Sequence, residues 1–122
     1  MAYFEGTNAN ETYVGTVGAD QIYGKGGNDT LNGLEGANII WGGDGNDTIK
    51  TGKGRDIIYG EDGDDLIQVI GNWSGTYVVG GYGADTVSLD KAKAGTLLSL
   101  DYDLRYDLGG GDPFDEIDVT IR

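Results

Sequence analysis

A short pattern of polar and apolar residues recurs along most of this chain. In the segment GGDGNDTIK, Gly42 to Lys50, six residues of turn type precede three of strand type. Gly, Asn and Asp favour turns, whereas Thr and Ile favour strands. The middle strand residue is apolar, so period-two alternation points it inward and its two neighbours outward. The pattern therefore predicts one short strand after each turn.

The pattern has a period of nine residues. Seven units follow one another without a gap over residues 6–68, and an eighth occupies residues 80–88. Between them lie residues 69–79, which we interpret as one unit with an insertion of two residues. Position eight of the units is apolar throughout: Tyr13, Ile22, Leu31, Ile40, Ile49, Ile58, Ile67 and Val87. Repetition at a fixed short period is typical of solenoids.

Nine residues are too few for a helical repeat, so each unit is predicted to supply one strand and one turn. Two units then make a coil of about eighteen residues, and successive coils stack about 4.8 Å apart. We predict a single all-β domain over residues 1–122. It has a flattened parallel coil of two sheets over residues 6–88, and a C-terminal β cap with an acidic tail over residues 89–122.

Composition indicates that hydrophobic burial alone does not hold this coil together. Glycine accounts for 24 of 122 residues, far above the usual share of about 7 %. Each glycine increases the entropy lost on folding. The chain carries 21 acidic and 8 basic residues, a net charge of −13. A core of one aliphatic residue per unit is too thin to offset these costs.

The same composition excludes several classes of function. A phosphate backbone or an anionic membrane surface would be repelled, so nucleic acid is not expected as a partner. There is no cysteine and no histidine, which leaves oxygen as the available metal ligand. No apolar run reaches 18 residues, and the start MAYFEGTNANE lacks the features of a signal peptide. We expect neither a membrane span nor an N-terminal export signal.

Because strands alternate between two sheets, the turns are predicted to stack in two columns. Column A turns begin at residues 6, 24, 42, 60 and 80, and column B turns begin at 15, 33, 51 and 69. Position six is acidic throughout column A: Glu11, Asp29, Asp47, Asp65 and Asp85. In column B it is more varied: Asp20, Asn38, Asp56 and Ser74.

Stacked glycine turns bring backbone carbonyls and carboxylates toward one gap. Ca²⁺ takes six to eight oxygen ligands at about 2.3–2.6 Å, whereas Mg²⁺ is stricter in geometry. We therefore predict three calcium sites in column A, between the turns starting at 24/42, 42/60 and 60/80. Two weaker sites are predicted in column B, at 15/33 and 33/51, which makes about five ions. The alternative is that Asp and Asn only satisfy the turn backbone, as in Asx-turns.

The unit GGDGNDTIK resembles the glycine-rich calcium repeat GGxGxDxUx of RTX (hemolysin-type) proteins. The resemblance covers about two thirds of the chain and implies a right-handed parallel β-roll with calcium between the stacked turns. It implies side-chain ligands at position six and carbonyl ligands early in each turn. The carried-over residues are Asp29, Asp47, Asp65 and Asp85, with carbonyls near Gly24, Gly26, Gly42, Asp44, Gly60, Asp62, Gly80 and Tyr82; Asp20, Asn38 and Asp56 take the equivalent place in column B.

An aromatic row marks the outer face of the sheet that follows column B. Tyr23, Trp41 and Tyr59 recur every eighteen residues, and Tyr77 falls on the same outward parity. Exposed apolar surface of this size is usually covered or functional. One interpretation is that residues 95–108 cover the row or close the open end of the coil. The other is a platform for glycan or for a protein partner.

We predict a calcium-binding structural module, not an enzyme, because the best-placed carboxylates are assigned to metal. The RTX resemblance implies that it folds on calcium binding outside the cell, after bacterial type I export, and supports a secreted parent protein. The alternative is a carbohydrate-binding module of a polysaccharide-modifying enzyme such as a mannuronan epimerase. The tail at residues 112–122 is open to two interpretations, a further ion site or an export signal.

Overall fold

The computed structural model describes residues 2–70, 76–89, 98–101 and 116–121. Every regular element within these ranges is a β-strand, and they contain no helix able to cross a membrane. The strands are β1 (Tyr3–Glu5), β2 (Thr12–Val14), β3 (Gln21–Tyr23), β4 (Thr30–Asn32), β5 (Ile39–Trp41), β6 (Thr48–Thr51), β7 (Ile57–Tyr59), β8 (Leu66–Val69), β9 (Thr76–Val79), β10 (Ala84–Leu89), β11 (Leu98–Asp101) and β12 (Glu116–Ile121).

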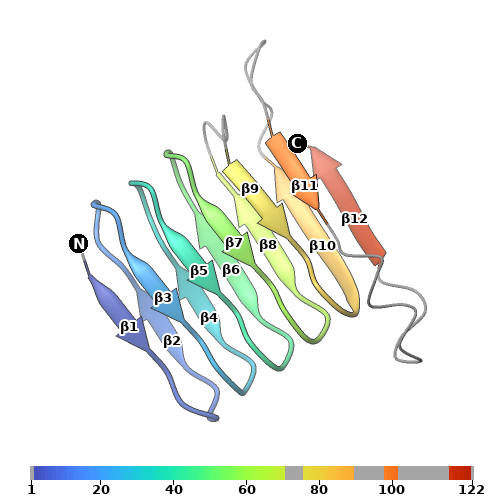
Figure 1. The fold of residues 1–122 in the computed structure, drawn as a ribbon, viewed down its shortest axis with the longest axis horizontal. Helices are drawn as coiled ribbons and strands as arrows, with labels where there is room; N and C mark the ends of the chain where they lie inside the picture. The colour runs from blue at the N-terminus through green and yellow to red at the C-terminus, as the bar shows by residue number, and fades with distance from the viewer. Residues whose placement is uncertain (1, 71–75, 90–97, 102–115, 122) are drawn as a thin grey trace.

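The strands form two parallel sheets that face each other (Figure 1). One sheet has the order β1-β3-β5-β7-β9-β11 and is called the aromatic sheet below. The other has the order β12-β10-β8-β6-β4-β2 and is called the threonine sheet. Consecutive strands always lie in opposite sheets, which confirms the predicted parallel β-roll.

The register confirms the eighteen-residue coil. Ile22 pairs with Ile40, and Ile40 pairs with Ile58. Turns therefore stack on turns of the same column. Column A turns lie along the lower edge of the stack in Figure 1 and lead into the threonine sheet, while column B turns lie along the upper edge and lead into the aromatic sheet.

Between β1 and β10 the register changes once, where the sequence shows its insertion. Ile57 pairs with Tyr77, an offset of twenty residues instead of eighteen. The extra residues therefore lie between the end of β8 and the start of β9. This corrects the expectation for Ser74, which lies outside the described residues, because Thr76 takes position six: its Oγ1 accepts the Asp56 N–H at 3.5 Å.

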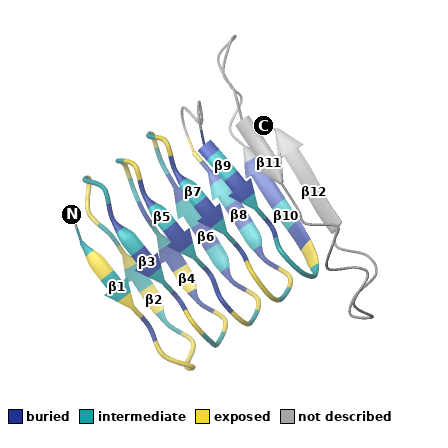
Figure 2. Ribbon diagram, viewed as in Figure 1, coloured by how far each residue is buried: buried dark blue, intermediate teal, exposed yellow. Residues whose placement is uncertain are grey.

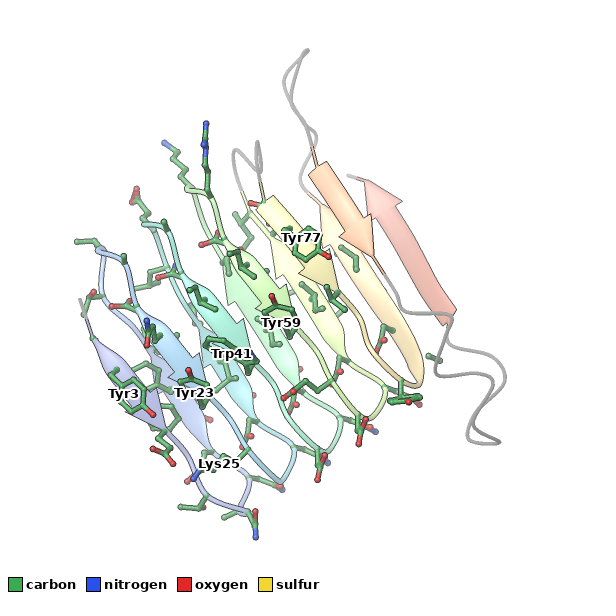
Figure 3. All side chains as sticks on the ribbon, in the orientation of Figure 1. Tyr3, Tyr23, Lys25, Trp41, Tyr59 and Tyr77 are labelled. Carbon is green, nitrogen blue, oxygen red and sulfur yellow. The ribbon has the colours of Figure 1, made fainter. Side chains whose placement is uncertain are left out.

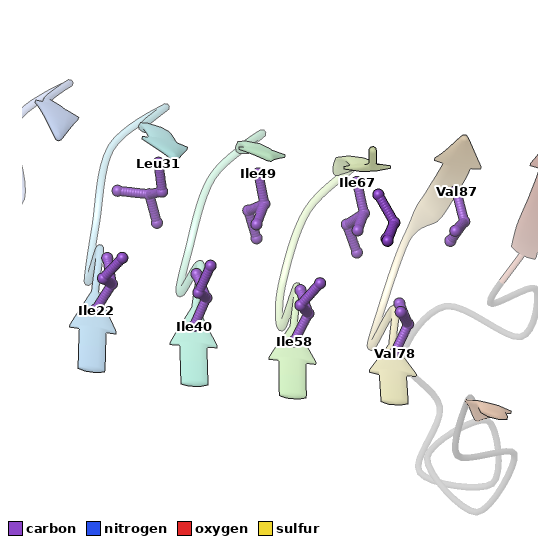
Figure 4. Close-up of a cluster of buried hydrophobic side chains, with 9 residues drawn as sticks. Ile22, Leu31, Ile40, Ile49, Ile58, Ile67, Val78 and Val87 are labelled. Carbon is purple, nitrogen blue, oxygen red and sulfur yellow. The ribbon is translucent and has the colours of Figure 1, made fainter. Parts of the chain in front are cut away.

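The core is a double row of aliphatic side chains between the sheets (Figure 4). Position eight supplies one side chain per strand. In the three-residue strands β3, β5 and β7 only the middle residue is buried (Figure 2). The fully buried apolar residues in the described ranges are Ile22, Leu31, Ile40, Ile49, Ile58, Ile67, Val69, Val78 and Val87. This confirms the inward positions predicted from Ile22 to Ile67 and at Val87, whereas Tyr13 is only partly buried, and Val69 and Val78 are additional core residues.

The N-terminal end begins one strand earlier than the sequence pattern indicates. β1 pairs with β3, which puts Phe4 at position eight beside Ile22. The Phe4 ring stacks on Tyr13 with centroids 4.1 Å apart, and both rings pack against the core. The first coil therefore closes its open end with two aromatic rings in place of two aliphatic chains.

The C-terminal strands extend the two sheets. β11 pairs in parallel with β9, and β12 pairs in parallel with β10 over six residues. The described part of residues 95–108 therefore forms the edge of the aromatic sheet and does not lie across its outer face. The remainder of that segment, residues 95–97 and 102–108, lies outside the described residues.

Candidate metal sites

The turns of both columns depend on left-handed backbone at position four. All six described glycines with this role from the second coil onward have positive φ: Gly27, Gly36, Gly45, Gly54, Gly63 and Gly83. Only glycine adopts such angles without steric cost. A Cβ on Gly45 would also collide with the carbonyl oxygen of Gly27 in the preceding coil. Stacked turns thus approach each other closely enough to share ligands.

Position-six carboxylates form a ladder along column A. Asp47 Oδ1 accepts the Asp29 N–H at 2.8 Å, and Asp65 Oδ1 accepts the Asp47 N–H at 2.8 Å. Each of these side chains is almost completely buried. The ladder fixes the orientation of each carboxylate, because one oxygen reaches back to the previous coil and the other points into the turns.

The second carboxylate oxygens have no hydrogen-bond partner. Oδ2 is buried and unpaired in Asp29, Asp47 and Asp65 of column A, and in Asp56 of column B. A buried polar atom without a partner costs about 1–3 kcal/mol, and more when it is charged. Three such atoms in successive turns of one column are the strongest indication that a cation fits there.

Backbone carbonyls converge on the same places as these unpaired oxygens. A Cβ on Gly24 would lie 2.5 Å from the Gly42 carbonyl oxygen and 2.6 Å from Asp29 Oδ2. One coil further, a Cβ on Gly42 would lie 2.6 Å from Asp47 Oδ2 and 2.8 Å from the Gly60 carbonyl oxygen. Oxygens from two successive coils therefore share one small space.

The third gap repeats this arrangement. A Cβ on Gly60 would lie 2.5 Å from Asp65 Oδ2 and 2.6 Å from the Gly80 carbonyl oxygen. Asp85 is also buried, and its Oδ1 accepts the Asp65 N–H at 2.9 Å. The oxygen-only donor set fits a hard cation such as Ca²⁺.

Burial raises the pKa of three column A carboxyls, those of Asp29, Asp47 and Asp65. The pKa of Asp47 rises to about 7 and that of Asp65 to about 9, first because of burial and then because of neighbouring carboxylates. Burial also raises the pKa of Asp29. These groups hold a charge at neutral pH only at a cost, and a bound divalent cation would remove that cost.

Side-chain carboxylates alone do not surround an ion in the described residues, where no group of three or more acidic side chains converges. The gaps therefore combine few carboxylates with carbonyls at position one. The predicted position-three carbonyls belong to residues at the rim of each turn: Gly26 and Tyr82 are half-buried, and Asp44 and Asp62 are exposed.

The chain matches a known family of repeats. Residues 5–40 and 41–68, just over half of the sequence, match the model of the RTX calcium-binding nonapeptide repeat in four copies. The chain belongs to this family. Its repeats bind calcium, which agrees with the oxygen-lined gaps of column A.

One solved structure similar to this chain is the solution structure of the AlgE6R3 subunit from the Azotobacter vinelandii mannuronan C5-epimerase. It shares 24 % sequence identity over 68 % of this chain, with a TM-score of 0.33. The match spans 46 % of that structure, less than half of its length. No curated protein matches the chain.

The column B carboxylates of this RTX chain are placed differently. Asp20 Oδ2 accepts the Thr16 N–H at 2.7 Å, and its Oδ1 accepts both the Thr16 hydroxyl at 2.8 Å and the Ala2 N–H at 2.9 Å. Burial acts to raise the pKa of Asp20, but these hydrogen bonds outweigh it and the pKa is lowered.

The other two column B residues also differ from each other. Asn38 is buried and fully hydrogen-bonded. Asp56 is buried with one unpaired oxygen, and burial raises its pKa to about 6. The three residues predicted as equivalent column B ligands thus have three different environments.

The structure also contains a second ladder, at position five of column A, which the sequence analysis did not predict. Asn28 Oδ1 accepts the Asn46 N–H at 2.8 Å, and Asn46 Oδ1 accepts the Asp64 N–H at 2.9 Å. Asn10 and Asp64 take part in the same way at the two ends of the ladder. The signal was present in the sequence, because position five carries Asn or Asp in these four column A turns.

The aromatic row lies on the outer face of the aromatic sheet (Figure 3). Tyr23 and Trp41 stack with centroids 4.1 Å apart and an interplanar angle of 3°, and Trp41 and Tyr59 follow at 5.8 Å and 16°. Tyr3 adds a tilted ring at 5.5 Å from Tyr23. Tyr77 pairs in register with Ile57, so the position-nine row continues with Val79 in its place.

Proposed function

We propose that this chain is a calcium-dependent structural module that folds where calcium is abundant and supports a larger secreted protein. The observation that carries the proposal is the series of buried, unpaired carboxylate oxygens in column A, each beside a carbonyl of the next coil. Without a cation these oxygens repel one another. With calcium bound, the ion binding energy becomes folding energy.

We assign one ion to each of three gaps in column A. Their side-chain ligands are Asp29, Asp47 and Asp65, and their carbonyl ligands include those of Gly42, Gly60 and Gly80. Asp85 closes the C-terminal end of the same ladder. Because the carboxylates serve as ligands, we assign no catalytic role to them.

Folding in response to calcium also gives the module a role in export. A chain with 21 acidic residues and 24 glycines stays extended where calcium is scarce, because collapse brings like charges together. In a calcium-rich medium outside the cell the same chain folds. This supports a secreted location and a type I export route.

The test is to remove and restore calcium. Far-UV circular dichroism of the chain in chelator is expected to show coil, and millimolar Ca²⁺ is expected to restore the β spectrum. Mg²⁺ at the same concentration is the control and is expected to restore little, since it retains water and needs stricter geometry. A full β spectrum in chelator would reject the proposal.

The stacked rings do not favour the carbohydrate-binding alternative. A sugar platform presents ring faces to the ligand, whereas Tyr23 and Trp41 lie face to face with each other. We assign the row to cross-strand stabilisation of the aromatic sheet. Titration with acidic and neutral oligosaccharides, followed by Trp fluorescence, is expected to give no shift; a saturable shift would restore that alternative.

A further inference from the structure

The column B turn at residues 33–38 satisfies its carbonyls with a side chain of its own. Asn38 Nδ2 lies 3.1 Å from the Gly33 carbonyl oxygen and 3.3 Å from that of Gly36. The carbonyl oxygens of Leu34 and Glu35 each lie 3.4 Å from the same nitrogen. Four carbonyls of one turn therefore converge on a single amide NH₂ group.

The other end of the amide determines its orientation. Asn38 Oδ1 accepts the Asp20 N–H at 3.0 Å, so a flipped amide would place NH₂ against that N–H and an oxygen against the carbonyls. In column A the matching oxygen, Asp47 Oδ1, accepts the Asp29 N–H in the same way. Asn38 Nδ2 thus has the place that the unpaired Oδ2 has in Asp47.

We infer that the Asn38 amide replaces the cation in this turn, so that column B closes at turns 15–20 and 33–38 without calcium. The inference rests on the proposed function of column A and deepens it by dividing the two columns. An amide supplies two hydrogens to carbonyls at no net charge. Calcium takes oxygen ligands, so an ion here would have to displace a nitrogen already bonded to those carbonyls.

The turn before it is also closed without metal. Both oxygens of Asp20 accept hydrogen bonds, including one from the Thr16 hydroxyl and one from the Thr16 N–H. The same Thr16 hydroxyl accepts the Gly18 N–H at 3.2 Å. Neither of the two column B sites expected from the sequence, 15/33 and 33/51, therefore fits a calcium ion.

The test exchanges one atom of the amide. Asn38→Asp places an oxygen where Nδ2 lies and creates the column A arrangement within column B. The number of calcium ions per folded chain, measured by elemental analysis after desalting from saturating Ca²⁺, is expected to rise by one relative to wild type. An unchanged number would overturn the inference.

Asn46→Asp is the matched control. It adds the same charge at position five of column A, where Asp64 already carries a carboxylate in the same ladder. No ion is expected to be gained. A gain equal to that of Asn38→Asp would overturn the inference, because added charge anywhere would then suffice.

The reciprocal exchange keeps the test decisive if Asn38→Asp does not fold. Asp47→Asn and Asp47→Ala are both expected to lose one ion, but the amide closes the turn as Asn38 does. Asp47→Asn is therefore expected to reach half-folding at about tenfold lower Ca²⁺ than Asp47→Ala. Equal requirements would overturn the inference.

The two proposals fail in different ways. If wild type binds no calcium and keeps its β spectrum in chelator, the proposed function is wrong. Asn38→Asp still decides the inference in that case, because a gain of one ion supports it and no gain rejects it.

Discussion

Column A and column B are built from the same nine-residue pattern, yet they satisfy their buried polar groups by different means. In column A, Asp47 and Asp65 each keep an unpaired oxygen beside a carbonyl of the next coil. In column B, Asp20 and Asn38 complete their hydrogen bonds within the protein. On the proposed assignment, column A requires a cation, whereas the first two turns of column B do without one.

The residues at the rims of the two columns also differ, in charge and in polarity. The column A rim carries exposed acidic residues such as Asp44 and Glu61, which favour cations. The column B rim carries Val17, Leu34 and Ile70, which line a shallow hollow with Glu35. The comparison teaches that a repeat can keep its backbone while one side-chain atom changes how a turn satisfies its buried carbonyls.

The largest contrast is expected when a position-six carboxylate is removed from each column. Asp47→Ala is expected to lose one bound calcium ion and about 3 kcal/mol or more of stability in calcium, because loss of a structural metal is among the most destabilising changes. Asp20→Ala loses hydrogen bonds from Thr16 and Ala2, about 1–2 kcal/mol, and no ion. Ion counting and thermal unfolding in saturating Ca²⁺ measure both. Equal ion loss in the two variants would break the comparison.

The next contrast concerns the glycines that let turns approach each other. Gly45 has φ of 104°, and a Cβ there would collide with the Gly27 carbonyl, so Gly45→Ala is expected to cost about 2 kcal/mol or more. A Cβ on Gly52 of column B would lie 3.2 Å from the Leu34 carbonyl oxygen without a left-handed backbone. Gly52→Ala is expected to cost about 1 kcal/mol or less. Calcium-induced folding midpoints for the two variants test the order.

A pH series is expected to separate the columns further. The raised pKa values of Asp47, about 7, and Asp65, about 9, mean that the folded, calcium-free chain binds more protons than the unfolded chain above about pH 4. Its stability is therefore greatest at acidic pH and falls as pH rises through these values. Asp20, with a lowered pKa, works in the opposite direction, and its contribution is lost only as pH falls below about 4.

Calcium-induced folding is expected to depend on pH only where the carboxyls of the unfolded chain are protonated. The unfolded chain and the calcium-bound chain both keep these carboxyls charged between pH 6 and 8, so the calcium concentration at half-folding is expected to stay nearly constant over this range. Below about pH 5 that concentration is expected to rise, because protons compete with calcium for the carboxylates. Circular dichroism in metal-stripped buffers and calcium titrations at each pH check the two parts. A calcium midpoint that does not rise at acidic pH would contradict the assignment of these carboxylates as ligands.

The smallest contrast lies in the position-five ladder. Asn46→Ala removes the acceptor for the Asp64 N–H and is expected to cost about 1 kcal/mol without loss of an ion. Ala37→Ser at the equivalent, exposed place in column B is expected to stay within about 0.5 kcal/mol of wild type. Thermal unfolding in saturating Ca²⁺ distinguishes them, and a larger effect at Ala37 would refute the special role of the ladder.

The sequence by itself determined the architecture. The nine-residue period and the apolar position eight define an eighteen-residue coil. Side chains alternate between the two faces of a strand, and a turn follows each strand of about three residues. It also determined that oxygen would be the ligand, since the chain contains no histidine and no cysteine. The first deduction depends on a local pattern that repeats in every unit, and the second depends on composition alone.

Only the tertiary structure decided which position-six side chains complete their hydrogen bonds within the protein. Asp20, Asn38 and Asp47 occupy the same position in their units, but their partners come from the next or the preceding coil and from the Thr16 hydroxyl. The register shift after β8 likewise put Thr76 at position six, where its Oγ1 accepts the Asp56 N–H. Contacts between coils depend on how whole turns stack, and a pattern within one unit does not contain that information.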